Sequence, residues 1–188
     1  MSEDIMENTS GVEMYVAFLR GINVGGRTFL KMEELKKAFE ALGFRHVKTV
    51  LASGNVLFEA SRGDAAALSG TIGKKLREVL GREVVVIVRP LEDLRKLQAL
   101  RPFEGTTAGM RLFVTLLPEK CRDISSPSMR DGFRILSVSD GMICSVLDER
   151  PGVGAVHLMG AIEKEFGPRV TTRTWNTILR ILRTGDAD

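Results

Sequence analysis

The residues that first suggest chemistry form a glycine-rich segment, GINVGGRT at residues 21–28. It follows an apolar run and differs by one residue from a phosphate-binding P-loop, which has lysine where this segment has arginine. A P-loop also needs a helix that begins at that point and an acidic residue that holds magnesium. Here the helical pattern begins only near Met32, and the apolar run at 84–88 ends in Arg-Pro. We therefore predict that the protein does not hydrolyse nucleotides.

Polar residues and glycines are concentrated in this segment and in two later ones. The three motifs are RGINVGG at 20–26, SGNVLFE at 53–59 and TTRTWNT at 171–177. In this order and spacing they resemble the family catalogued as domain of unknown function 1697, over roughly residues 14–182. The resemblance implies a two-subdomain α+β fold with a ferredoxin-like first half. It implies no established activity, cofactor or catalytic residue.

The elements that must position these motifs follow the order β-α-β-β-α-β in the first half of the chain. The apolar run at 14–19 is typical of a central strand that is buried on both faces. A helical pattern at 32–42 follows, and then two short strands around Gly54 and Asn55, which we predict as a two-residue type II′ turn. A second helix and a last strand complete the unit. Residues 14–90 are therefore predicted to form a ferredoxin-like subdomain, an antiparallel sheet with both helices on one face.

Residues 91–184 are predicted to form a second, smaller α+β subdomain. They contain a short helix, a strand, a hairpin around residues 140–141 and a helix at 156–166. A terminal helix follows, with Thr171 or Thr172 as its cap. We expect this terminal helix to pack back on the first subdomain.

The predicted sheet, with strand order 4-1-3-2, places the loop after Arg20 and the 53–55 turn at the same end. The first helix also begins at that end. Its free N–H groups, those of the glycine-rich loop, and the cations of Arg20, Arg27 and Lys31 together form a predicted anion pocket.

The third motif is predicted to join this pocket, because buried polar groups need partners and three short polar motifs are best explained if they meet. Arg173 or Asn176 should then lie within hydrogen-bonding or one-water reach of the 20–26 loop or the 53–55 turn, and Trp175 should be largely buried beside them. The candidate ligand-binding residues are Arg20, Asn23, Gly25, Gly26, Arg27, Ser53, Asn55, Arg173 and Asn176.

Three functions remain open for these motifs. The first is the binding of a small phosphorylated or carboxylated ligand between the subdomains. The second is the binding of single-stranded RNA, since Tyr15 lies on a strand where RNA-recognition motifs carry stacking aromatics. The third is a structural role, in which the motifs only join the two halves. If Arg173 is a buried tie its donors should be satisfied internally, whereas a ligand site requires exposed donors.

Composition excludes several other classes. The 188 residues carry a formal charge of +3, and residues 1–13 hold four acidic residues and no basic ones, which predicts a disordered acidic tail. No apolar run approaches the roughly 20 residues of a membrane helix. Cys121 and Cys144 are widely spaced, which is typical of a reducing compartment, and we expect a cytoplasmic monomer. Neither histidine has a second metal ligand at suitable spacing, so no metal or cofactor is predicted. The sequence shows no pair of nucleophile and base, and whether the protein is an enzyme is left open.

Overall fold

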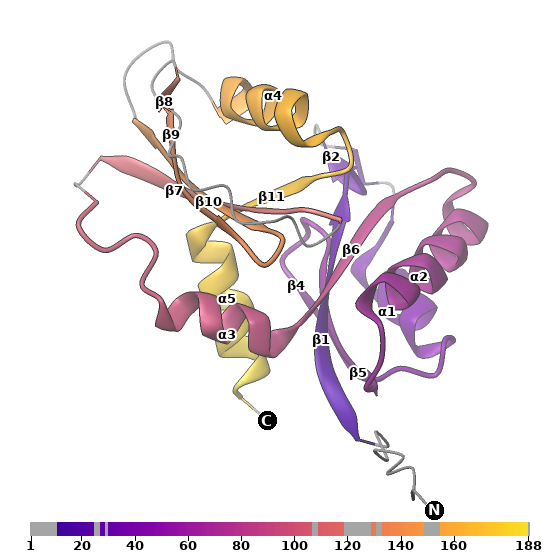
Figure 1. Cartoon of the computed structure of the whole chain (residues 1–188). Helices are drawn as coiled ribbons and strands as arrows, with labels where there is room; N and C mark the ends of the chain where they lie inside the picture. The colour runs from indigo at the N-terminus through magenta and orange to yellow at the C-terminus, as the bar shows by residue number, and fades with distance from the viewer. Residues whose placement is uncertain are drawn as a thin grey trace, which may run out of the picture.

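The computed structural model describes residues 11–24, 27–28, 30–106, 109–118, 129–130, 133–148 and 155–187. Within these residues lie five helices and two main antiparallel sheets, so that the fold is α+β as predicted (Figure 1). Most of the predicted acidic tail, residues 1–10, lies outside the described residues.

The first sheet has four antiparallel strands in the order β4-β5-β1-β6, which is the predicted ferredoxin-like order 4-1-3-2. The strands are β1 (Val12–Arg20), β4 (Arg45–Val50), β5 (Asn55–Ser61) and β6 (Val85–Pro90). Five consecutive residues of β1, 15–19, are buried. This continuous burial confirms the prediction of a central strand that is covered on both faces.

The second sheet has five strands in the order β11-β7-β10-β9-β8. They are β7 (Met110–Leu116), β8 (Met129–Arg130), β9 (Phe133–Ser139), β10 (Met142–Asp148) and β11 (Thr171–Thr174). The predicted hairpin between β9 and β10 is confirmed: Asp140 and Gly141 both have positive φ, the combination that a two-residue type I′ turn requires. A separate short hairpin pairs β2 (Asn23–Val24) with β3 (Arg27–Thr28).

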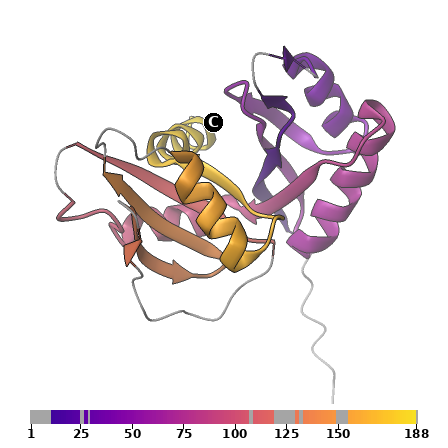
Figure 2. The same ribbon diagram turned by 90° about the horizontal axis from the view of Figure 1, so that it is seen from above.

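The helices and sheets alternate in five layers. α1 (Met32–Glu40) and α2 (Ala65–Leu80) cover the outer face of the first sheet, as predicted. α3 (Leu91–Ala99) and α5 (Trp175–Gly185) fill the space between the two sheets, and α4 (Ala155–Phe166) covers the far face of the second sheet (Figures 1 and 2). The two sheets therefore share one central hydrophobic core around α3 and α5.

The turn between β4 and β5 differs from the predicted two-residue type II′ turn. The connection runs from Leu51 to Gly54, and Asn55 is already the first strand residue, paired with Val50. The Asn55 side chain is fully buried and donates to the Val50 carbonyl at 2.9 Å and to Ser53 Oγ at 3.0 Å. These bonds across the turn stabilise the longer connection.

The start of the third motif also differs from its prediction. Thr171 and Thr172 do not cap a helix but belong to β11, which pairs with β7. The N-cap of α5 is Thr174, whose hydroxyl accepts a bond from the amide of Thr177. These residues pair with the free edge of β7 instead, and this tertiary pairing overrides the local preference of threonine for a helix cap.

The second half repeats the topology of the first. Strands β9, β10, β7 and β11 lie in the same order as β4, β5, β1 and β6, and each last strand leads directly into a helix of the central layer. The registers match as well, since Val16 pairs with Arg89 and Val114 pairs with Arg173. Arg89 and Arg173 therefore occupy equivalent positions in two related halves.

Candidate functional site

Arg173 joins the third sequence motif to the second and to Leu19, the residue just before the first motif. Its three guanidinium nitrogens lie within hydrogen-bond distance of six oxygen atoms. Nε donates to Asn55 Oδ1 at 2.6 Å, and Nη2 donates to the Leu19 carbonyl at 2.8 Å and to the Ser53 carbonyl at 3.2 Å. The prediction that Arg173 or Asn176 lies within hydrogen-bonding reach of the 20–26 loop or the 53–55 turn is therefore confirmed, by Arg173 and at the turn.

All of these acceptors are neutral. Nη1 donates to Thr171 Oγ1 at 2.8 Å and to the Thr172 carbonyl at 3.0 Å, and the guanidinium carbon lies 5.8 Å from the centre of the Phe18 ring. Burial lowers the pKa of Arg173 to about 10, and no carboxylate counters this shift. Arg173 thus carries a charge at neutral pH that no acidic residue within the described part of the chain neutralises.

A pocket of about 280 Å³ lies beside Arg173, between the two halves of the molecule. Arg20 lines it and forms an ion pair of 2.6 Å with Glu163 of α4. The same guanidinium donates to the carbonyls of Pro168 and Val170. Among the described lining residues, two arginines and one glutamate leave a formal charge of +1.

Two hydroxyl groups of this pocket have hydrogens to donate. Ser53 Oγ accepts from the Asn55 amide, and Thr171 Oγ1 accepts from Arg173. No described residue takes the hydrogen of either hydroxyl, and both side chains line the pocket. The site therefore combines positive charge with hydroxyl donors, whereas Leu19, Ile22 and other apolar side chains form the rest of its wall.

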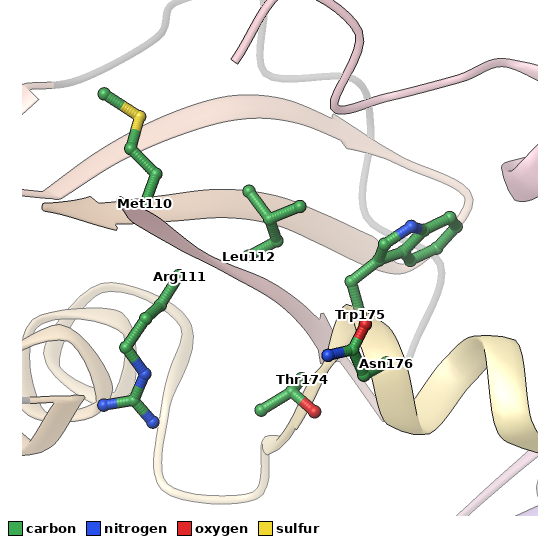
Figure 3. A pocket seen from close by; sticks show the side chains of 6 residues that line it. All are labelled: Met110, Arg111, Leu112, Thr174, Trp175 and Asn176. Atoms are coloured by element: carbon green, nitrogen blue, oxygen red, sulfur yellow. The ribbon is translucent and has the colours of Figure 1, made fainter. Parts of the chain in front are cut away.

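The other predicted site residues do not all meet here. Asn176 is exposed and lines a different pocket of about 360 Å³ together with Arg111 and Trp175 (Figure 3). Trp175 is only partly buried, and its indole packs on the Phe103 ring at 5.1 Å between centroids. The prediction that Trp175 is a buried anchor beside the first two motifs is wrong, because the start of α5 turns its side chain towards the loop after α3.

Part of the predicted glycine-rich site lies outside the described residues, namely Gly25 and Gly26. Asn23 and Arg27 are described only as strand backbone in the β2–β3 hairpin. The N-terminus of α1 contributes no described residue to the pocket. Its first turn carries acidic residues, and the Glu34 carboxylate accepts from the Lys31 amide at 3.2 Å. The described residues thus do not bring this helix end into the site.

Sequence analysis missed Arg89, the counterpart of Arg173. Its side chain is buried and donates to the carbonyls of Leu117 and Gly141 in the second half. Burial lowers its pKa, and Nε has no partner within the described residues. The residues Arg-Pro at the end of a strand suggested only a stop signal, and the role of the arginine is visible only from its contacts with the second half.

Tyr15, the residue that suggested RNA stacking, is fully buried on the α1 and α2 side and stacks on Phe58. The opposite face of this sheet is covered by α3 and α5. Within the described part of the chain, no cluster of three or more histidine, cysteine or acidic side chains is arranged to hold a metal ion. Nor does any described helix have the length and apolar character needed to span a membrane.

Comparisons with known proteins agree with this fold. The family model described as "Protein of unknown function (DUF1697)" matches residues 12–131, which include the first two motifs. The conserved bacterial protein SP0830 from Streptococcus pneumoniae has a similar solved structure, with a TM-score of 0.70 and 18% identity over 92% of this chain and 98% of that one. Among curated proteins no match was found.

Proposed function

The chain belongs to the DUF1697 family of proteins of unknown function, and from its site we propose that it is a cytoplasmic protein that binds a small phosphorylated or carboxylated ligand between its two halves. One observation carries the proposal: the guanidinium of Arg173 is buried beside a pocket and has no carboxylate partner among the described residues. A buried charge is costly unless it is paired, and an anion in the pocket would supply the pair. The widely spaced cysteines support a reducing compartment.

The ligand would be held by charge and by two specific donors. The guanidinium of Arg173 is already occupied by protein oxygens, so its contribution is electrostatic. Ser53 and Thr171 would donate their hydroxyl hydrogens to the anion, because both oxygens already accept a bond from the protein. Arg20 would keep its bond to Glu163 and position the rim of the pocket.

Isothermal titration calorimetry with inorganic phosphate, glycerol 3-phosphate and succinate tests this proposal. We expect at least one of these anions to bind, and Ser53→Ala and Thr171→Val each to weaken it about tenfold, since a hydrogen bond to a charged group contributes about 1.5 kcal/mol or more. Ser61→Ala, at the exposed end of β5, is the matched control and should leave the affinity unchanged. Binding that neither pocket variant weakens would place the ligand elsewhere.

A second candidate function is supported by the same residue. The saturation of the Arg173 nitrogens by protein oxygens favours a structural role, in which the motifs only join the two halves. Under this alternative none of the three anions binds, and Ser53→Ala and Thr171→Val alter only the unfolding temperature. The titration therefore separates the two functions.

A further inference from the structure

A second pocket, of about 470 Å³, lies between α2 and the outer edge of β6. It occupies the place in the first half that the candidate site occupies in the second half. Each pocket lies between the last strand of its half and the helix that precedes that strand. Each also reaches the end of the first strand of the other half: the candidate site reaches Leu19 near the end of β1, and the second pocket reaches Pro118 just after β7. We name the second pocket the β6 groove, lined by Ser69, Gly73, Lys74, Arg77, Val86 and Arg169 among others.

The backbone of β6 presents hydrogen-bonding groups to this groove. The amide of Val88 donates to Ser69 Oγ at 3.0 Å, on the side of the strand that faces away from β1. Alternate residues of a strand direct their N–H and C=O groups to the same side. The polar backbone groups of Val86 therefore face the groove, and they have no partner among the described residues.

The equivalent edge in the second half is covered by an arginine. Arg20 donates to the carbonyls of Pro168 and Val170, which both lie just before β11. Leu19 and Leu117 are equivalent, since their amides donate to the carbonyls of Gly54 and Gly141, both at 2.8 Å. The residue after Leu117 is Pro118, which has no such side-chain donor. The edge of β6 is thus left open where the edge of β11 is covered.

The charge of the groove selects the kind of segment that would pair with this edge. Lys74, Arg77 and Arg169 line it together with one acidic residue, Glu83, so three positive charges and one negative leave a formal +2. Arg77 lies 3.4 Å from Glu83 on the exposed surface. Gly73 leaves room on the α2 side of the groove because it has no side chain. A Cβ added there would lie 3.9 Å from a methyl carbon of Val86.

We propose that the β6 groove binds an extended acidic peptide segment, which adds a strand to the open edge of β6. Backbone hydrogen bonds to Val86 would provide the pairing, and carboxylates of the segment would meet Lys74, Arg77 and Arg169. A peptide fits better than a nucleic acid because only a peptide backbone offers the alternating donors and acceptors that a strand edge requires. This inference is independent of the ligand proposed for the other pocket.

Fluorescence anisotropy with a labelled eight-residue peptide of alternating glutamate and threonine tests the inference. We expect saturable binding, and the double variant Lys74→Glu/Arg77→Glu should weaken it at least tenfold, because each reversal turns attraction into repulsion. The matched control Lys36→Glu reverses an exposed charge on α1 and should leave the affinity unchanged. Hydrogen exchange at the Val86 amide should slow when the peptide is bound.

A second peptide separates strand addition from simple charge attraction. Methylation of alternate backbone nitrogens keeps every carboxylate but removes the donors, so the methylated peptide should bind at least tenfold more weakly. The proposal is overturned if the methylated peptide or an eight-nucleotide oligouridine binds as well as the plain peptide, or if Val86 exchange does not change. Absence of peptide binding, or light scattering that shows a dimer formed through β6 and lost in the charge-reversed variant, would equally overturn it.

Discussion

Arg89 and Arg173 each donate hydrogen bonds to backbone carbonyls of the other half of the molecule. Arg173, from the second sheet, donates to the Leu19 carbonyl of the first, and Arg89, from the first sheet, donates to carbonyls of Leu117 and Gly141 in the second. A guanidinium suits this task because its planar donors satisfy several carbonyls at once, whereas an ammonium is a compact point charge with three donors. Each arginine therefore supplies donors to backbone carbonyls at strand ends of the other half, which would otherwise lack these partners.

Arg173→Ala should lower the free energy of unfolding by about 3 kcal/mol, because it leaves buried acceptors such as Asn55 Oδ1 unsatisfied. Arg173→Lys should recover part of that loss, since lysine keeps the charge but not the geometry. Urea unfolding followed by circular dichroism measures both. Arg183→Ala, on the exposed face of α5, is the control and should change stability by less than about 0.5 kcal/mol. Equal losses of stability in the two alanine variants would contradict the role of Arg173 as a buried link between the two halves.

Cys144 should behave as a buried and unreactive thiol. Burial raises the pKa of Cys144 to about 11, so the folded thiol keeps its proton where an unfolded one loses it. The folded state then binds more protons than the unfolded state above about pH 9, and this residue's contribution to stability falls as the pH rises through that range. Mass spectrometry after iodoacetamide treatment at pH 8 should find the Cys144 peptide unmodified in the native protein and modified in urea. Rapid native labelling would refute this expectation.

At the scale of elements, the turn between β4 and β5 depends on Gly54. Its φ of +78° is a left-handed conformation that favours glycine, and a Cβ there would lie 2.9 Å from Ile22 side-chain atoms and 3.1 Å from Leu19 Cβ. The close approach allows the Gly54 carbonyl to accept from the Leu19 amide at 2.8 Å. This turn thereby holds the end of β1 at the rim of the candidate site.

Gly54→Ala should be clearly more destabilising than Gly43→Ala. Gly43, after α1, has a φ of +83° but nothing within 4 Å of an added Cβ, so it carries only the conformational cost of about 1 kcal/mol. Gly54→Ala adds a steric cost of about 1–3 kcal/mol, because Ile22 and Leu19 must move. Thermal unfolding of the two variants measures the difference. The same loss of stability in both would show that the close contact at Gly54 has no energetic weight.

At the scale of the whole molecule, the central core connects the two sheets, together with Arg89 and Arg173, which each bond to the other half. Phe18 of β1, Leu94 of α3, Val114 of β7 and Ile178 of α5 belong to one buried cluster. Removal of either half would expose the inner face of the other. The division into subdomains at 14–90 and 91–184 stays a prediction about topology, and this shared core argues that the two halves unfold together.

Unfolding should therefore be a single transition. Trp175, the only tryptophan of the chain, reports on α5 by its fluorescence, and hydrogen exchange of β5 amides reports on the first sheet. The two probes should give the same urea midpoint, and Arg89→Ala should shift both by the same amount. Separate midpoints, or a shift confined to one probe, would show two independently folding units.

The sequence by itself determined the elements and where most of them begin and end. Helix and strand periodicity and turn residues are local signals, so the apolar run of β1, the turn at Asp140 and Gly141, and the order of the first sheet were all predictable. That order in turn placed the loop after Arg20 at the same end as the 53–55 turn. The density of polar residues indicated that Arg173 or Asn176 would reach one of them, and Arg173 donates to the Ser53 carbonyl of the turn.

Only the tertiary structure decided what each polar group meets. Whether Thr171 begins a helix or joins a sheet depends on the open edge of β7, which lies more than fifty residues earlier in the chain. The repeat that relates Arg89 to Arg173 is defined by strand order and strand register, and both of these become visible only in the fold. The satisfaction of a buried donor is likewise non-local, because its acceptors come from strands that only the fold brings together.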